Sequence, residues 1–417
     1  MRASAGTPRS VLNTVLLALG LMANLAPMAT FAAVLPEIAA AWGLNASEAG
    51  WISGIYFAGY AASVPILATL TDRIDGRRVF ALSSLLGAGA SLAFAGWADG
   101  FWIAVAARLV SGMALGGVHM PGLKLLAERT AGQARRRGSA IYASSYALGA
   151  AGSFFRAGAV DAAFGWRGAF AISGLVPLIG IIVAVLLPAA SETVPKTDSA
   201  FDLRPLIRNR ALLGYVLAFA GNIWEVSAVR AWFVAYLVWT LSLPHNGLDM
   251  PTPAVISGLA SLAGFPVSIA IAEFALRWGS RAIVLTCLAS VSILLALAGT
   301  AGGPSIVILP LLVLAQIASM ADASALASGA VAAADPARRG AALALYAFTG
   351  YTAAFIGPVA VGVALDAFGG TESRAGWAAA FATMALGSIA AIWAVRFGRR
   401  RATAAAPRGQ LAVGPDQ

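Results

Sequence analysis

Residues 69–79 read Thr-Leu-Thr-Asp-Arg-Ile-Asp-Gly-Arg-Arg-Val, a short charged segment between two long apolar runs. Five of the seven residues from Asp72 to Arg78 are charged, although only 11% of the residues in the whole chain are. A turn of this kind can join two antiparallel membrane-spanning helices but cannot itself lie in hydrocarbon. A weaker copy at residues 276–281, Leu-Arg-Trp-Gly-Ser-Arg, follows about half a chain later, also between two apolar runs. The recurrence indicates an internal duplication.

The composition is that of a membrane protein. Of the 417 residues 59% are hydrophobic, whereas soluble domains have about 45 to 50%. The net charge of +10 comes from short basic clusters between apolar runs, which is unlike the single basic face of a nucleic-acid-binding protein. The one cysteine, Cys287, predicts neither a disulfide nor a zinc site. The chain contains no HExxH, GxSxG or P-loop motif, so we predict no enzymatic activity, no cofactor and no metal.

Twelve apolar runs are long enough, at about 20 residues each, to cross a bilayer as helices. They cover residues 11–34, 49–70, 79–97, 101–123, 138–160, 168–188, 211–237, 254–276, 281–299, 304–326, 340–364 and 376–396. Twelve crossings place both termini on one side of the membrane, and 22 of the 28 Lys and Arg residues belong to the termini and loops of that side. Because basic residues are retained in the cytoplasm, we predict a bacterial inner-membrane protein with both termini cytoplasmic.

The two halves of the sequence align at more than the charged turn. Three further matches recur at offsets of 202 to 205 residues: Arg136-Arg137-Gly138 with Arg338-Arg339-Gly340, Asp161 with Asp366, and Phe164-Gly165 with Phe368-Gly369. We therefore predict an N-terminal six-helix half at residues 1–188, a cytoplasmic linker at 189–210, a C-terminal six-helix half at 211–396 and a basic cytoplasmic tail at 397–417. Repeated halves with a site at their interface are the usual plan of secondary transporters.

The charged turn resembles the loop signature of the major facilitator superfamily of secondary transporters, G-x-x-x-D-R-x-G-R-R. Three positions depart from it: Ala68 replaces the first glycine, Asp75 is an added residue, and Leu276 replaces the aspartate of the second copy. Residues 108–117 and 164–170 resemble the fourth span and the turn before the sixth span of the same superfamily. The resemblance covers nearly the whole chain and implies an all-α membrane protein, with twelve transmembrane helices in two pseudo-symmetric halves.

The resemblance also assigns a gating role to the charged turn, at Asp72, Arg73, Gly76, Arg77 and Arg78. It implies that Asp72 caps the N-terminus of a neighbouring helix and pairs with arginines, which holds the cytoplasmic side shut.

Four ionisable residues within predicted spans form a candidate substrate site, because a charge inside the membrane is costly and needs a partner. At a rise of about 1.5 Å per residue, Arg108, Arg156 and Arg230 lie in the periplasmic half of the membrane and Glu225 lies near its middle. Glu225 and Arg230 point about 140° apart on one helix, so we expect Glu225 to meet an arginine from the other half. A purely structural ion pair between helices is the alternative interpretation.

His119 and Asp322 occupy matched positions of the repeat, at an offset of 203 residues. An imidazole and a carboxylate at matched depth predict a cytoplasmic gate or a proton relay, with Glu225 as a further proton-coupling group. The alternative is a histidine bonded only to a backbone carbonyl. We expect Lys124 to extend its amine to the cytoplasmic interface.

Trp224-Glu225, followed by Arg230-Ala231-Trp232, resembles a string found in the cyanate-permease-like branch of the superfamily. Trp224 lies deep enough to line the cavity and joins the substrate-binding candidates. Trp232 and Trp239 fit the aromatic belt at the membrane interface.

These features predict a secondary transporter that moves a small polar or anionic solute by alternating access, coupled to protons. Three buried arginines against one carboxylate near their depth favour an anionic substrate. We expect a monomer in the lipid bilayer without a nucleic-acid partner. The alternative is a proton-driven multidrug efflux antiporter, in which Glu225 or Asp322 carries the proton; Ser153, in place of the proline of the G-P pattern of drug antiporters, weighs against it.

Overall fold

The computed structural model describes residues 8–188, 204–244, 250–335 and 338–399, and within these ranges every regular element is a helix. The N-terminal half contains α1 (Pro8–Asn24), α2 (Thr30–Trp42), α3 (Ala46–Leu70), α4 (Gly76–Trp97), α5 (Phe101–Arg129), α6 (Gly132–Leu175), the 3-10 helix η1 (Val176–Leu178) and α7 (Ile179–Leu186). The C-terminal half contains α8 (Arg204–Arg208), α9 (Arg210–Ser242), α10 (Pro253–Trp278), α11 (Ser280–Thr300), α12 (Ser305–Ala321), α13 (Ala323–Ala333), α14 (Arg339–Ala367) and α15 (Arg374–Arg399). The predicted all-α membrane fold is confirmed.

Ten helical stretches within the described ranges are long and apolar enough to cross a membrane on their own. One of them, Gly132–Leu186, contains two crossings, because the chain turns at Gly165, whose φ of 67° and ψ of 178° interrupt the helix. A further crossing is divided between α1 and α2, neither of which is long enough alone. The described residues therefore accommodate the twelve crossings that the sequence predicts.

Two crossings are interrupted at positions that we did not predict. In the first, α1 ends at Asn24 and α2 begins at Thr30. Pro27 lies in this break, and proline has no backbone N–H and clashes with the preceding helical turn. In the tenth, Asp322 separates α12 from α13. Non-helical backbone at membrane depth is tolerated only where protein groups or water satisfy it, so both breaks indicate the interior of the bundle.

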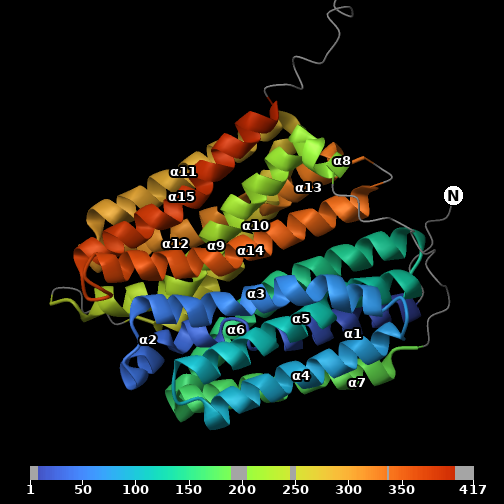
Figure 1. Ribbon diagram of the computed structural model, residues 1–417, viewed down its shortest axis with the longest axis horizontal. Coiled ribbons are helices and arrows are strands. Elements are labelled where there is room, and N and C mark those ends of the chain that lie inside the picture. Colours follow the sequence, from blue (N-terminus) through green and yellow to red (C-terminus); the bar gives the residue numbers. More distant parts are fainter. Residues whose placement is uncertain (1–7, 189–203, 245–249, 336–337, 400–417) are drawn as a thin grey trace, which may run out of the picture.

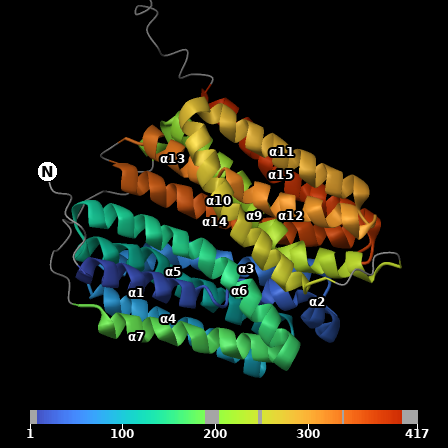
Figure 2. The same cartoon turned by 180° about the vertical axis from the view of Figure 1, so that it is seen from behind.

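The two halves lie side by side, with the N-terminal half below and the C-terminal half above in Figure 1, and with α6 against α10 in the view from behind in Figure 2. We call the end of the bundle where α1 begins the inner end, for its predicted cytoplasmic position, and the opposite end the outer end. Towards the outer end α3 and α14 touch at their backbones. A Cβ atom on Gly54 would lie 2.3 Å from the carbonyl oxygen of Phe355, and one on Gly50 would lie 2.5 Å from that of Pro358. Only glycine permits this approach.

The turns that the repeat pairs have related backbones. Gly165 and Gly369 both have positive φ angles, 67° and 102°, which glycine adopts without strain. Of the predicted linker, residues 204–208 form α8 and residues 189–203 lie outside the described residues. Residues 400–417, most of the predicted tail, also lie outside them.

Candidate functional site

Two arginines donate hydrogen bonds to the backbone carbonyls at the break in the first crossing. Arg108 of α5 donates from Nη1 to the carbonyl of Pro27 at 2.7 Å and from Nη2 to the carbonyl of Met28 at 3.1 Å. Arg156 of α6 donates from Nη2 to the carbonyl of Ala26. The break leaves these carbonyls without helical donors, so the two guanidinium groups stabilise the backbone there. Sequence reasoning missed this role, for which Pro27 inside an apolar run was the available signal.

Arg108 and Arg230 line the same small cavity, of about 20 Å³, between the two halves. The guanidinium of Arg108 also lies over the ring of Tyr56, 4.5 Å from its centre. Arg230 comes from α9, where its Nη2 lies 3.8 Å from the sulfur of Met320 and its buried Nε has no acceptor. Among the described residues, no carboxylate forms an ion pair with either arginine. The cavity is completed by small, apolar and aromatic side chains, including those of Ser53, Phe57 and Ser227.

Arg156 does not line this cavity, contrary to our expectation of a three-arginine site. Its Nη2 donates to Ser173 Oγ at 2.9 Å as well as to the carbonyl of Ala26, so it faces the first crossing and the sixth. We assign it to the support of the α1–α2 break.

Glu225 and Trp224 also lie away from the cavity that the arginines line. Glu225 is 1% exposed and accepts a hydrogen bond from Ser388 Oγ of α15, so the expected partnership with an arginine is wrong. Trp224 donates from Nε1 to the carbonyl of Thr383, also on α15, at 3.1 Å. Glu225 and Arg230 are five residues apart on α9, so their side chains point about 140° away from each other. Arg230 faces the N-terminal half, and Glu225 therefore packs within the C-terminal half.

His119 and Asp322 are not brought together. His119 Nδ1 hydrogen bonds with the hydroxyl of Tyr60 at 2.8 Å. Asp322 accepts from Asn222 Nδ2 at 2.5 Å and from Cys287 Sγ at 3.2 Å, all within the C-terminal half. The predicted contact across the halves is therefore absent from the described residues, because each side chain is bonded inside its own half.

The charged turn is held by different pairs from those that the resemblance implied. Asp72 forms an ion pair with Lys124 of α5 rather than with an arginine, so Lys124 does not simply extend to the interface. Asp75, the added residue, is the helix cap: it accepts from the backbone N–H of Arg77 at 2.9 Å at the start of α4. The Arg77 guanidinium bonded to it lowers the pKa of the Asp75 carboxyl. Gly76 is the first residue of α4, and two arginines of the turn, Arg73 and Arg78, are exposed.

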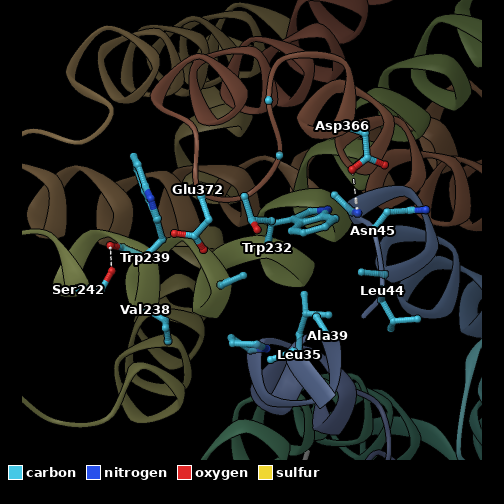
Figure 3. A pocket seen from close by; sticks show the side chains of 18 residues that line it. Leu35, Ala39, Leu44, Asn45, Trp232, Val238, Trp239, Ser242, Asp366 and Glu372 are labelled. Atoms are coloured by element: carbon cyan, nitrogen blue, oxygen red, sulfur yellow. Dashed lines mark hydrogen bonds between the residues drawn. The ribbon is translucent and has the colours of Figure 1, made fainter. Parts of the chain in front are cut away.

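Two cavities of more than about 500 Å³ lie between the halves among the described residues. The inner cavity, of about 580 Å³, separates α3 and α5 from α9 and α14 and is mostly apolar, with Tyr60 and Tyr351 among its lining. The outer cavity, of about 650 Å³, lies between α2, α9 and the α14–α15 turn. Figure 3 shows Glu372 of this turn between Trp232 and Trp239 of α9. These two tryptophans are buried, so they are not the interfacial belt that we expected.

Asp366 connects the two halves at the outer end, beside this cavity. Its carboxylate, at the end of α14, accepts from the backbone N–H group of Ala46, the first residue of α3, at 2.9 Å (Figure 3). It also accepts from the backbone N–H group of Ser47, the next residue, at 2.7 Å. The bonds join the two halves and place a negative charge at a helix N-terminus, where it is stabilised. The sequence showed Asp366 only as the repeat counterpart of Asp161.

Comparison with known proteins gives a family and a set of relatives. The family model of the Major Facilitator Superfamily matches residues 17–358. The niacin transporter NiaP of Acinetobacter baylyi is 30% identical over 203 residues, which are 46% of this chain and 44% of that protein. The putative niacin/nicotinamide transporter NiaP of Bacillus subtilis is 25% identical over 230 residues, 54% of this chain and 53% of that protein. The chain thus spans about half the length of these curated relatives.

Solved structures agree on the fold. A bacterial homolog of the human lysosomal transporter Spinster, inward-facing and unoccupied, has a TM-score of 0.78 at 16% identity, with 94% of this chain and 97% of that chain covered. The nucleoside transporter NupG, as a mutant, has a TM-score of 0.77 at 13% identity, with 93% and 100% covered.

Proposed function

This chain belongs to the major facilitator superfamily, and from that premise we propose that it carries a small organic anion across the bacterial inner membrane by alternating access, together with protons. It is a multi-pass membrane transporter of a small solute and not an enzyme. The finer assignment, to an aromatic or heteroaromatic monocarboxylate, rests on the chemistry of the small cavity that Arg108 and Arg230 line.

The observation that carries the proposal is the pair of arginines at this cavity. Arg108 donates to two backbone carbonyls, whereas Arg230 has the Met320 thioether as its one hydrogen-bond acceptor among the described residues, with Tyr146 and Tyr351 close enough to interact with it electrostatically. A buried guanidinium without an anionic partner is costly, and its planar fork suits a carboxylate. Arg230 is therefore the proposed anchor for the substrate carboxylate, with Arg108 adding positive charge. Phe57 offers an apolar face to a ring.

Two relatives support this substrate class. They are named for niacin, a pyridine carboxylate, and one of the names adds nicotinamide, its neutral amide. A carboxylate anchored by Arg230 predicts that this chain prefers the acid to the amide, because the amide cannot neutralise the guanidinium.

The contacts between the halves support alternating access. Backbone contacts between α3 and α14 and the hydrogen bonds of Asp366 join the halves beside the outer cavity, while the inner cavity separates them at the inner end. This is the arrangement of an inward-facing carrier, in which substrate exchanges with the cytoplasm.

Counterflow in proteoliposomes tests the proposal. We expect vesicles preloaded with unlabelled nicotinate to take up labelled nicotinate, and nicotinamide to compete at least about tenfold less well. Arg230→Lys should weaken nicotinate binding about tenfold or more, because lysine keeps the charge but loses the fork. Arg281→Lys, at an exposed position on α11, is the matched control and should leave binding unchanged.

A second function, efflux of amphipathic drugs, is favoured by the apolar lining of the inner cavity. The same vesicles distinguish it. Transport of tetraphenylphosphonium, a lipophilic cation, in place of nicotinate would reject the anion proposal and support efflux.

A further inference from the structure

A second group of buried polar side chains lies inside the C-terminal half. Asp322, at the junction of α12 and α13, receives hydrogen bonds from Asn222 of α9 and Cys287 of α11. Glu225 of α9 receives one from Ser388 of α15. The two acids are 3% and 1% exposed, and Asn222, which bonds to Asp322, lies three residues before Glu225 on the same face of α9. Four crossings thus converge on one pair of acids.

Within the part of the chain that the structure describes, no basic side chain compensates this pair of acids. Among the described residues, the other titratable groups that face it are Cys287 from α11 and Tyr346 from α14, neither of which is a cation. Two buried carboxylates near one another cannot both ionise at small cost. The pair of carboxylates therefore requires one positive charge. In this closely packed region a proton needs less space than any other cation.

The hydrogen bonds show which acid would hold the proton. Asp322 has a donor on each carboxylate oxygen, the arrangement of a fixed anion. Glu225 accepts from Ser388 on Oε2, and Ser290 also interacts with its carboxylate, whereas Oε1 is buried without a hydrogen bond. Asn222 Oδ1 is likewise a buried acceptor without a donor, and residues three apart share a helix face. A proton on Glu225 Oε1 would give this oxygen a hydrogen bond to donate, and Asn222 Oδ1 would be its acceptor.

The pair of acids lies on the far side of α9 from the small cavity that Arg108 and Arg230 line. Glu225 and Arg230 are five residues apart on this helix, so they point about 140° away from each other. The bonds of Glu225 and Asp322 run to α9, α11 and α15, whereas Arg230 lines the cavity between the halves. One helix therefore carries the anchor for the anion on one face and Glu225, one of the two acids, on another.

We propose that Glu225 is the site of the coupling proton, that Asp322 is the fixed anion which sets its proton affinity, and that proton and substrate bind separately on opposite faces of α9. This inference rests on the proposed function as a carrier of organic anions. Of the Arg230 guanidinium and the Glu225 carboxylate, either ligand alone leaves one uncompensated, whereas both ligands together compensate the two. The expected result is symport of one proton with one monovalent anion.

The steady-state accumulation ratio of labelled nicotinate in proteoliposomes tests the proton site. With the outside one pH unit more acidic, one-to-one symport should concentrate nicotinate about tenfold inside. Glu225→Gln should only equilibrate it, to a ratio near one. The ratio is a thermodynamic readout, so a variant that is merely slowed still reaches tenfold. Glu273→Gln, which removes an exposed carboxylate of α10, is the matched control and should reach tenfold.

The pH midpoint of nicotinate uptake tests the roles of Asp322 and Ser388, because the two substitutions should shift this midpoint in opposite directions. Asp322→Asn removes a neighbouring negative charge, so Glu225 should take up its proton only at lower pH. Ser388→Ala removes a donor to the Glu225 carboxylate, so protonation should occur at higher pH. Both variants keep Glu225 and should still accumulate nicotinate, and they test the inference even where Glu225→Gln does not fold.

Tenfold accumulation by Glu225→Gln, accumulation driven by a Na+ gradient, or midpoints that do not move would each overturn the inference. A wild-type protein that shows nicotinate counterflow but ignores the pH gradient rejects the proton site alone. Absence of counterflow by the wild type rejects the proposed function instead.

Discussion

At the scale of single residues, the three membrane arginines have different tasks. Arg108 and Arg156 bond to carbonyls that the α1–α2 break releases, whereas Arg230 has no such partner. Arg108→Ala leaves two buried carbonyls without donors, and we expect a loss of stability on the order of 3 kcal/mol. Arg230→Ala removes an uncompensated charge, so the thermal stability without ligand should match that of the wild-type protein. Added nicotinate should no longer raise the stability of this variant.

Melting curves of the purified protein in detergent, with and without nicotinate, measure both effects. Equal destabilisation by the two substitutions would contradict the division of tasks. Retained stabilisation by nicotinate in Arg230→Ala would contradict its role as the anchor.

At the scale of elements, Asp366 connects α14 to the N-terminus of α3. Its hydrogen bonds to two backbone N–H groups must break before the outer end opens. Bonds to a charged group contribute about 2 kcal/mol, so Asp366→Asn should shift the population towards the outward-open state by roughly thirtyfold. Spin labels at the exposed positions Asp99 and Glu372, one in each half at the outer end, would report longer distances by pulsed EPR.

Asp161 provides a matched control for this prediction. It is the repeat counterpart of Asp366 and lines a cavity beside Pro253 and Ala254 of α10, but no hydrogen bond to α10 forms within the described part of the chain. Asp161→Asn should therefore change the distance distribution much less. Equal shifts for both variants would mean that the outer end is held by packing rather than by this carboxylate.

At the scale of the whole molecule, the charge distribution predicts the orientation in the membrane. Because 22 of the 28 basic residues belong to the side of the termini, that side should be cytoplasmic. Cysteines introduced at Ser199 and Asn246, which both lie outside the described residues, should label oppositely. Native Cys287 is buried and should contribute little background.

An impermeant maleimide added to intact spheroplasts should label Asn246→Cys at once and Ser199→Cys only after permeabilisation. Labelling of Ser199→Cys in intact spheroplasts would invert the topology and exchange the inner and outer ends.

The sequence by itself determined that this is an all-α membrane protein, which segments cross the membrane and which superfamily it resembles. Hydrophobic length is a local property: a run of apolar residues long enough to span the bilayer does so whatever its neighbours are. The duplicated turn at residues 69–79 and the paired glycines Gly165 and Gly369 are local as well, since a charged or positive-φ turn is readable from a few residues. The resemblance carried by these motifs is confirmed by the family match to residues 17–358.

Only the tertiary structure decided which side chains meet. Helical depth placed Glu225 near the arginines, but the rotation of α9 turned it towards Ser388 and left Arg230 at the cavity. Rotation about a helix axis is set by packing on all sides, and the weakly amphipathic pattern of a buried membrane helix does not specify it. The break at Pro27 engaged both terminal nitrogens of Arg108, because every buried backbone group at membrane depth must find a partner.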